Sequence, residues 1–342
     1  MSMQTAATMC TLDYVKTIGL VAVQLGRGFV NPYDLVVSGD GRIFVLNRCD
    51  SARAALVRVG IVNFDEDYLG EFGKGYGTGD GQLILPVAMA VDSQERLYIT
   101  DEHTHRISLF DLSGNFLSKW GGVGSGEGQL NGPAGIAIDA DDHVYVVDQH
   151  NNRVQKFTTD GQYLSQWGEA GRGPGQFNLP WGVTVDAQGS VYVADWRNDR
   201  IQKFSPSGQF LASFGESGEG NGQFHRPSSV AVDPEGCIYI SDWGNERVQV
   251  LGPDGSFQLQ LRGQATLSKW AKEFLAVNPD EKETREMSNL IPALPPHLHT
   301  PHHISSQTEP YFWGPVSVTL DKAGRLYVTE ANRHRIQIYQ KR

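Results

Sequence analysis

The sequence predicts an all-β chain folded as a six-bladed β-propeller, a closed ring of four-stranded sheets. Two observations predict this fold: a long internal repeat, and two chain ends that complete each other. The 342 residues include 39 Gly and 16 Pro, as expected of many short strands joined by turns. A repeat of roughly 40 to 50 residues with four strands per copy is typical of propeller blades.

The repeat is marked by prolines that open each copy. Four consecutive copies align without gaps and open 47 residues apart, at Pro86, Pro133, Pro180 and Pro227. A degenerate first copy opens at Pro32 and a last one at Pro315, which makes six. Each copy contains an alternating apolar run, a Tyr-Val-type run, an Arg-Ile-type run and an outer run ending in Trp-Gly or Phe-Gly, with turn residues between them. These runs predict four strands per blade, named a to d from the inside outwards.

The two ends of the chain share the last blade. The sixth copy stops after its third strand, at IQIYQKR, and the run from Tyr14 to Gly19 matches the outer strands of other copies. We expect the N-terminal strand to close this blade, because closure removes an exposed sheet edge. The prediction is one domain, 1–342, with an N-terminal segment 1–28, blades 1–5 in 29–264, an insert in 265–312, and three strands of blade 6 in 313–342.

The insert departs from the repeat by about 41 residues. Its apolar residues at i, i+3, i+4, i+7 and i+8 predict an amphipathic helix; they are Leu267, Trp270, Ala271, Phe274 and Leu275. Asn278-Pro279 followed by acidic residues predicts a second helix. The helix pair is either a lid over the central funnel or a packed elaboration of the ring.

The connections DQHNNRV and DWRNDRI, each after a Tyr-Val strand, resemble those of the NHL repeat family. The resemblance implies six blades whose b–c and d–a connections lie on one face, here called the top face. Five acid/Arg pairs recur at a spacing of five, and we interpret them as structural clasps. The pairs are Asp101/Arg106, Asp148/Arg153, Asp195/Arg200, Asp242/Arg247 and Glu330/Arg335.

Composition limits the partners. Lys plus Arg is 29 against 39 Asp plus Glu, a net charge of −10, which argues against a nucleic-acid partner. No apolar run approaches the ~20 residues of a membrane span, so no membrane partner is expected. The start has no secretory pattern, and the three widely spaced cysteines fit a reducing compartment, so we expect a cytoplasmic protein.

The candidate site is the top face. Its loops are rich in aromatic side chains and include Tyr33, Trp181, Trp196, Trp243 and Trp313, which are the predicted ligand-binding residues together with Arg48. The Arg-x-Asp of Arg48 and Asp50 resembles a loop of the peptidyl-hydroxyglycine amidating lyases, whose Arg is catalytic. Those lyases hold a metal through His after the blade-opening proline, a position occupied here by Tyr33, Val87, Ala134, Trp181, Ser228 and Val316. That particular metal site is therefore not expected.

Three functions remain open. The first is binding of a small molecule or peptide with an apolar or aromatic body and a carboxylate. The second is a lyase or hydrolase at the same face, with Arg48, His103 and His150 as catalytic residues. The third is a protein–protein scaffold with a partner on the top face.

No cofactor is identified from the sequence. A divalent metal is considered at His302 and His303, which lie in a His-rich tract that we expect to be extended. The run from Asp139 to His143 is read as a plain turn, since it lacks the Gly and Glu of a calcium loop.

Overall fold

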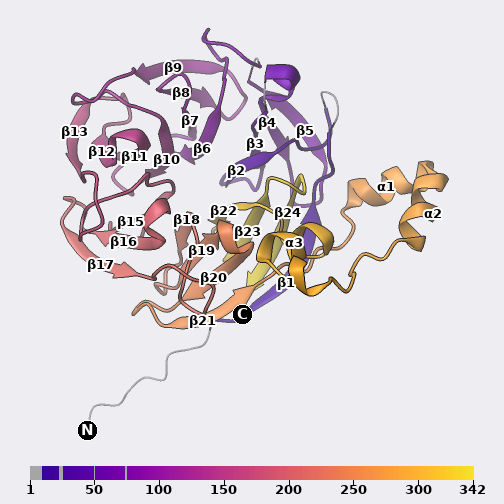
Figure 1. The fold of residues 1–342 in the computed structure, drawn as a ribbon. Coiled ribbons are helices and arrows are strands. Elements are labelled where there is room, and N and C mark those ends of the chain that lie inside the picture. The colour runs from indigo at the N-terminus through magenta and orange to yellow at the C-terminus, as the bar shows by residue number, and fades with distance from the viewer. Residues whose placement is uncertain (1–9, 23–25, 50, 74) are drawn as a thin grey trace.

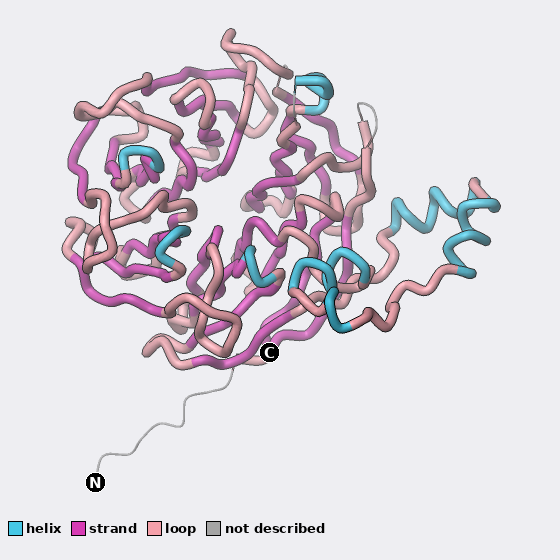
Figure 2. The backbone as a smooth tube through the Cα atoms, viewed as in Figure 1, coloured by secondary structure: helices cyan, strands magenta, loops and turns pink. Residues whose placement is uncertain are grey.

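A computed structural model describes residues 10–22, 26–49, 51–73 and 75–342 of the chain. It shows a closed ring of six four-stranded antiparallel sheets around a central axis (Figure 1), which confirms the predicted propeller. The backbone trace in Figure 2 shows that strands and loops build the ring, while the longer helices lie at its edge. None of the described helices is long and apolar enough to cross a membrane.

Five blades are built from consecutive strands. Blade 1 is β2–β5, with bounds Pro32–Val37, Ile43–Asn47, Arg58–Val62 and Tyr68–Phe72. Blade 2 is β6–β9, with bounds Pro86–Val91, Arg96–Asp101, Arg106–Asp111 and Phe116–Gly121. Blade 3 is β10–β13, with bounds Pro133–Ile138, Val144–Asp148, Arg153–Phe157 and Tyr163–Trp167. Blade 4 is β14–β17, with bounds Val183–Val185, Val191–Asp195, Arg200–Phe204 and Phe210–Phe214. Blade 5 is β18–β21, with bounds Pro227–Val232, Ile238–Asp242, Arg247–Leu251 and Phe257–Leu261.

The sixth blade joins the two ends of the chain, as the sequence predicts. Its strands β22, β23 and β24 (Pro315–Leu320, Arg325–Glu330 and Arg335–Lys341) are completed by β1 (Leu12–Ile18). β1 pairs antiparallel with β24, from Leu12 opposite Lys341 to Ile18 opposite Ile336. Next to β1, Cys10 forms a disulfide with Cys237 of blade 5, across 227 residues of sequence. The bond disagrees with the sequence analysis, which took the three widely spaced cysteines to fit a reducing compartment, because nothing in their spacing selects a pair.

The core lies between neighbouring blades. At four junctions, the last aromatic residue of one blade's outer strand packs on the c–d turn of the next blade. The turn needs Gly at this contact, because a Cβ on Gly161, for example, would lie 2.4 Å from the Trp120 ring. The 6–1 junction differs, since the strand ends in Ile18 and the turn residue is Glu66. Trp270 of the insert fills this junction instead, buried among Ile18, Phe29 and Val62.

The insert contains two helices at the edge of the ring and one on the top face. α1 (Lys269–Val277) and α2 (Pro279–Met287) project outwards from the ring (Figure 1), and α3 (Pro301–Gln307) lies against the 3-10 helix Trp243–Asn245. Further 3-10 helices are Ser51–Leu56, Gln149–Asn151, Trp196–Asn198 and Pro296–Leu298. Of the two expected roles for the α1–α2 pair, the position fits a packed elaboration, because the pair lies away from the centre of the ring.

Candidate functional site

The predicted clasps are built in four of five blades. The Arg Nε donates to the paired carboxylate over 2.7 Å in Asp148/Arg153, 2.9 Å in Asp195/Arg200, 2.7 Å in Asp242/Arg247 and 2.8 Å in Glu330/Arg335. Each carboxylate also accepts a backbone N–H of the d–a connection, such as that of Asn178 for Asp195. The clasps therefore fix the b–c and d–a connections to each other, which gives the top face a rigid base.

Blade 2 contradicts the clasp prediction. Asp101 accepts the amides of Ile84 and Leu85, whereas Arg106 donates to the carbonyls of Thr78, Gly79 and Gln82 and does not pair with Asp101. In each of the four complete clasps, a Gln side chain also donates a hydrogen bond to the acid. Blade 2 has Ser108 in place of this Gln.

Blade 1 retains half of the clasp. Asn47 replaces the acid and accepts the Val30 amide, while Arg58 takes the Arg position, 2.9 Å from Glu71. Arg58 follows Asn47 by 11 positions, against 5 between Asp148 and Arg153, and this six-residue extension hides the equivalence in the sequence.

Aromatic residues from three blades meet at the mouth of the ring. A cavity of about 260 Å³, here called the rim cavity, is lined by Tyr33, Trp181, Trp196, Ser228, Trp243 and Val316. Neighbouring ring centroids lie 6.4 Å apart for Tyr33 and Trp181, and 6.2 Å apart for Trp181 and Trp196. Trp243 continues the series at 6.4 Å from Trp196. The structure thus brings together four of the aromatic residues that the sequence selected.

Two arginines flank the aromatic wall, and the sequence analysis missed both. The guanidinium of Arg226 lies 5.0 Å from the Trp196 ring centroid, and that of Arg197 lies 5.5 Å from it. Neither forms an ion pair with any acid in the described part of the chain. Arg226 directly precedes a blade-opening proline, so its place in the repeat could have drawn attention to it. Neither arginine lines the rim cavity itself, and the Asp199 carboxylate accepts the Arg226 backbone amide over 2.7 Å. An anionic group above Trp196 would meet two guanidinium groups that have no ion pair of their own among the described residues.

Arg48 lies beside this cavity but is already engaged. Its Nη2 donates to Glu102 over 2.7 Å, and its guanidinium lies 4.7 Å from the Tyr33 ring centroid. Its Nη1 has no hydrogen-bond partner among the residues that the structure describes. Burial raises the pKa of the Tyr33 hydroxyl above its usual value. Arg48 therefore packs against the Tyr33 ring and has one nitrogen, Nη1, without a hydrogen-bond partner among the described residues. Asp50, the other residue of the predicted Arg-x-Asp loop, lies outside the described residues.

Below the rim cavity, the inner strands surround a central channel of about 240 Å³. The channel and the rim cavity share Tyr33, Trp181, Ser228 and Val316 in their walls. Asp34 also lines the channel, and its Oδ2 accepts the Met89 amide over 2.8 Å. Desolvation by burial raises the pKa of Asp34 to about 6. The sequence analysis did not select this residue, although it is a charged residue within an inner strand.

Trp313 does not line the rim cavity. Its ring centroid lies 6.0 Å from that of His302, and the Arg333 guanidinium lies 5.4 Å from its ring. His302 and His303 lie on α3, not on the extended segment that their spacing suggested. His302 Nδ1 lies 3.2 Å from Glu246, and His303 Nδ1 lies 2.7 Å from the helix-capping Thr300. The two histidines thus have separate partners, and their metal role stays a prediction.

The predicted catalytic histidines lie on exposed parts of the b–c connections. His103 and His150 are both exposed, and neither lines the rim cavity or the central channel. Other top-face histidines have structural contacts, since His105 and His334 each accept the amide of the residue before the next blade's proline through Nδ1. The catalytic assignment of His103 and His150 stays a prediction.

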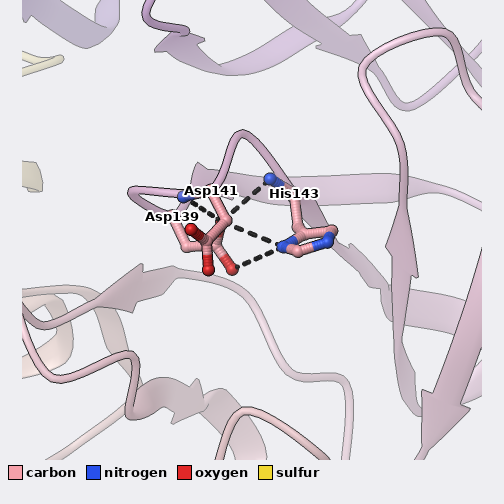
Figure 3. A group of neighbouring side chains, drawn as sticks. All are labelled: Asp139, Asp141 and His143. Atoms are coloured by element: carbon pink, nitrogen blue, oxygen red, sulfur yellow. Dashed lines mark hydrogen bonds and ion pairs between the residues drawn. The ribbon is translucent and has the colours of Figure 1, made fainter.

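One group of three metal-ligand side chains occurs among the described residues, formed by Asp139, Asp141 and His143 (Figure 3). Asp139 accepts the amides of Asp141 and His143, and its carboxylate also lies 2.9 Å from the Tyr145 hydroxyl. The equivalent turn aspartates of other blades, such as Asp92 and Asp321, accept turn amides in the same way. The group therefore lies in the repeated a–b turn, as the sequence predicted, and its Asp139 carboxylate is engaged in holding that turn.

Comparison with known families agrees with the repeat. The NHL repeat model matches residues 130–157, 177–204, 224–251 and 312–339, which belong to the four blades with complete clasps. Protein lin-41 of Caenorhabditis elegans is 44% identical over 48 residues, a match that covers 14% of this chain and 4% of that protein. The chain therefore spans only a small part of that relative's length.

Solved structures share the fold at low sequence identity. A catalytically inactive virginiamycin B lyase from Staphylococcus aureus, with quinupristin, has a TM-score of 0.56 at 13% identity, over 94% of this chain and 82% of that one. A streptogramin B lyase has a TM-score of 0.55 at 13% identity, over 98% of both chains. A protein of unknown function from Bacteroides thetaiotaomicron has a TM-score of 0.61 at 17% identity, over 98% of this chain and 77% of that one. The chain therefore contains NHL repeats, in four of its blades, within a closed six-bladed β-propeller.

Proposed function

We propose that the top face binds a ligand with a flat apolar or aromatic body and an anionic group, at the rim cavity. The observation that carries the proposal is the wall of four aromatic side chains, which come from three blades and line one cavity of about 260 Å³. A concave, mostly apolar site with a few convergent polar groups is the usual form of a ligand pocket.

The size and the charge of the site narrow the ligand. A volume near the lower end of ligand pockets fits one aromatic side chain or a small aromatic acid rather than a large molecule. Arg226 and Arg197 lie against Trp196 without acidic partners in the described residues, so they would bind a carboxylate while the rings pack on the apolar body. A peptide with an aromatic and an acidic residue meets the same requirements.

Calorimetric titration with 3-phenylpropanoate tests the proposal. We expect the wild-type protein to bind it, and Arg226→Gln and Trp243→Ala each to weaken binding by about tenfold or more, because a charged hydrogen bond or an aromatic wall is lost. Arg172→Gln and Trp313→Ala are the matched controls, since Arg172 is an exposed loop arginine and Trp313 lies outside the cavity. Equal losses in the controls, or no binding by a folded wild-type protein, would overturn the proposal.

A further inference from the structure

The six inner strands contain a single charged side chain. Two residues after the blade-opening proline, the other five blades have small residues: Ala88, Gly135, Gly182, Ser229 and Ser317. Blade 1 has Asp34 at this position. Apart from Tyr33, no other residue of β2, β6, β10, β14, β18 or β22 titrates, since these strands consist of apolar, Ser, Thr, Gly and Pro residues.

The contacts of Asp34 give its carboxylate a hydrogen-bond donor but no cation to balance its negative charge. Its Oδ2 accepts the Met89 amide of blade 2 over 2.8 Å. No Lys, Arg or His of the described residues forms an ion pair with it. A neutral Asn could accept the same hydrogen bond through its Oδ1, whereas a buried carboxylate without a cation costs free energy. Structural linkage alone therefore does not explain why the residue is acidic.

The position of Asp34 relative to the rim cavity suggests a role for the charge. The channel that Asp34 lines shares four wall residues with the rim cavity, among them Tyr33, the direct neighbour of Asp34 in the chain. A ligand held between the tryptophans would extend its inner end towards this carboxylate. Since the channel walls are otherwise uncharged, the group that best matches Asp34 is a cation.

We propose that the ligand of the rim cavity carries a protonated amine, which binds the Asp34 carboxylate in the central channel. The inference rests on the proposed function and adds a third feature to the ligand: an ammonium group inside, an apolar body between the tryptophans, and an anionic group at Arg226. Both the amino terminus of a peptide and a small arylalkylamine have this ammonium chemistry.

The pH dependence of binding follows from the same geometry. The ammonium group binds ionised Asp34, and burial raises the pKa of this carboxyl to about 6. Affinity for amine ligands should therefore fall as the pH decreases from 7.5 to 5. The neighbouring strands β3, β6 and β22 have no titratable residue. The strand β23, which also packs against β2, contains Arg325, paired with Asp321, and Glu330, paired with Arg335. Burial raises the pKa of Tyr33 and of Tyr327 in β23, so both stay neutral in this range. At the mouth, Arg48 is paired with Glu102.

Stability should change in the opposite direction. The folded pKa of Asp34 is raised, so its contribution to stability is greatest below the unfolded pKa of about 4 and is lost as the pH rises through about 6. We therefore expect Asp34→Asn to fold and to be at least as stable as wild type at pH 7.5. A weakened ligand affinity in this variant would then report the lost charge rather than unfolding.

Titration calorimetry with four probes tests the inference. The probes are 3-phenylpropanoate, phenethylamine, the dipeptide Phe-Glu and N-acetyl-Phe-Glu. At pH 7.5 we expect Asp34→Asn to weaken binding of the free-amine probes by about tenfold or more, and to leave 3-phenylpropanoate and the acetylated peptide within about threefold. Acetylation should weaken wild-type binding by a similar factor. The control Thr184→Val removes an uncharged polar group from the channel wall and should not discriminate between the probes.

The outcomes separate this inference from the proposed function. If 3-phenylpropanoate binds but Phe-Glu and its acetylated form bind equally, or Asp34→Asn binds both as wild type does, the ammonium site is refuted and the proposed function stands. If no probe binds, both fail. Thermal stabilisation by sodium or magnesium chloride alone, lost in Asp34→Asn, would show an inorganic-ion site and overturn the proposal. Phenethylamine binding as tightly as Phe-Glu identifies a small amine, and binding of the dipeptide alone identifies a peptide terminus.

Discussion

At the scale of single residues, the clasp shows how the repeat supports a binding surface. Asp195 is fully buried and accepts four donors, from the Asn178 amide, the side chains of Asn198 and Gln202, and Arg200. Burial raises the pKa of this carboxyl, and the donors around it counteract the effect. The clasp thus holds the loop of Trp196 in place through backbone contacts on both sides, and so positions the rim cavity without touching a ligand.

Removal of one clasp carboxylate should destabilise the whole domain. We expect Asp195→Ala to lower the free energy of unfolding by about 3–5 kcal/mol, because it leaves the largely buried Arg200 charge without its carboxylate and leaves the Arg200 Nε and the Asn178 amide without their acceptor. Urea denaturation measures the change. Asp160→Ala is the control, since Asp160 is 78% exposed and its nearest cation, in Arg96, lies 3.9 Å away. A change below about 0.5 kcal/mol in Asp195→Ala would contradict the structural role of the clasp.

At the scale of elements, the insert supplies the aromatic residue that the junction between blades 6 and 1 lacks. The outer strand of blade 6 ends in Ile18 where blades 1 to 4 have an aromatic residue, and α1 supplies Trp270 to the same place. The Trp270 indole donates to the Glu66 carbonyl, and Ser268 caps α1 while donating to the Gly19 carbonyl. The first turn of α1 is therefore part of the ring, whereas its later residues, such as Val277 at 77% exposure, are outside it.

Truncation of Trp270 should weaken the 6–1 junction. We expect Trp270→Ala to cost about 3–5 kcal/mol of folding stability, as for other buried aromatic residues, and to increase amide hydrogen exchange in α1. Phe274→Ala on the same helix is the matched control, because Phe274 is 42% exposed, and it should cost about 1 kcal/mol or less. Equal costs for the two variants would show that α1 does not depend on this contact.

At the scale of the whole molecule, the ring is held closed near the N-terminus. β1 fills the outer position of blade 6 along the whole of β24, and the adjacent Cys10–Cys237 disulfide joins this segment to blade 5. β1 pairs with the edge that β24 would otherwise expose, and the disulfide adds a covalent link between this segment and blade 5. The top face depends on this closure, because the walls of both cavities come from blades at opposite ends of the sequence.

Deletion of residues 1–18 should therefore destabilise the entire ring. We expect the melting temperature to fall by about 10 °C or more, since the loss of a paired strand and of buried Ile18 amounts to several kcal/mol. Differential scanning calorimetry measures the shift. Deletion of residues 1–9, which keeps Cys10 and β1, is the control. A protein lacking 1–18 that melts at the same temperature as the full chain would contradict closure by β1.

The sequence by itself determined the periodic features of this protein. Strand alternation, the 47-residue interval and the match of Tyr14–Gly19 to other outer strands predict six blades and their closure, because each depends on local pattern and on comparison between copies. The helix that begins near Trp270 and the aromatic character of the top loops follow in the same way.

Only the tertiary structure decided which residues of different copies meet. Both Trp243 and Trp313 lie in connections of the top face, yet Trp243, in a b–c connection, lines the rim cavity and Trp313, in a d–a connection, packs on His302. Asp34 faces the channel, and Arg226 contacts Trp196 from the neighbouring blade. The pairing of Cys10 with Cys237 and the place of Trp270 also depend on contacts across more than 200 residues of sequence. The physical reason is that a repeat fixes the shape of each blade, whereas ring closure and the packing between blades set the distances between side chains that lie far apart in the chain.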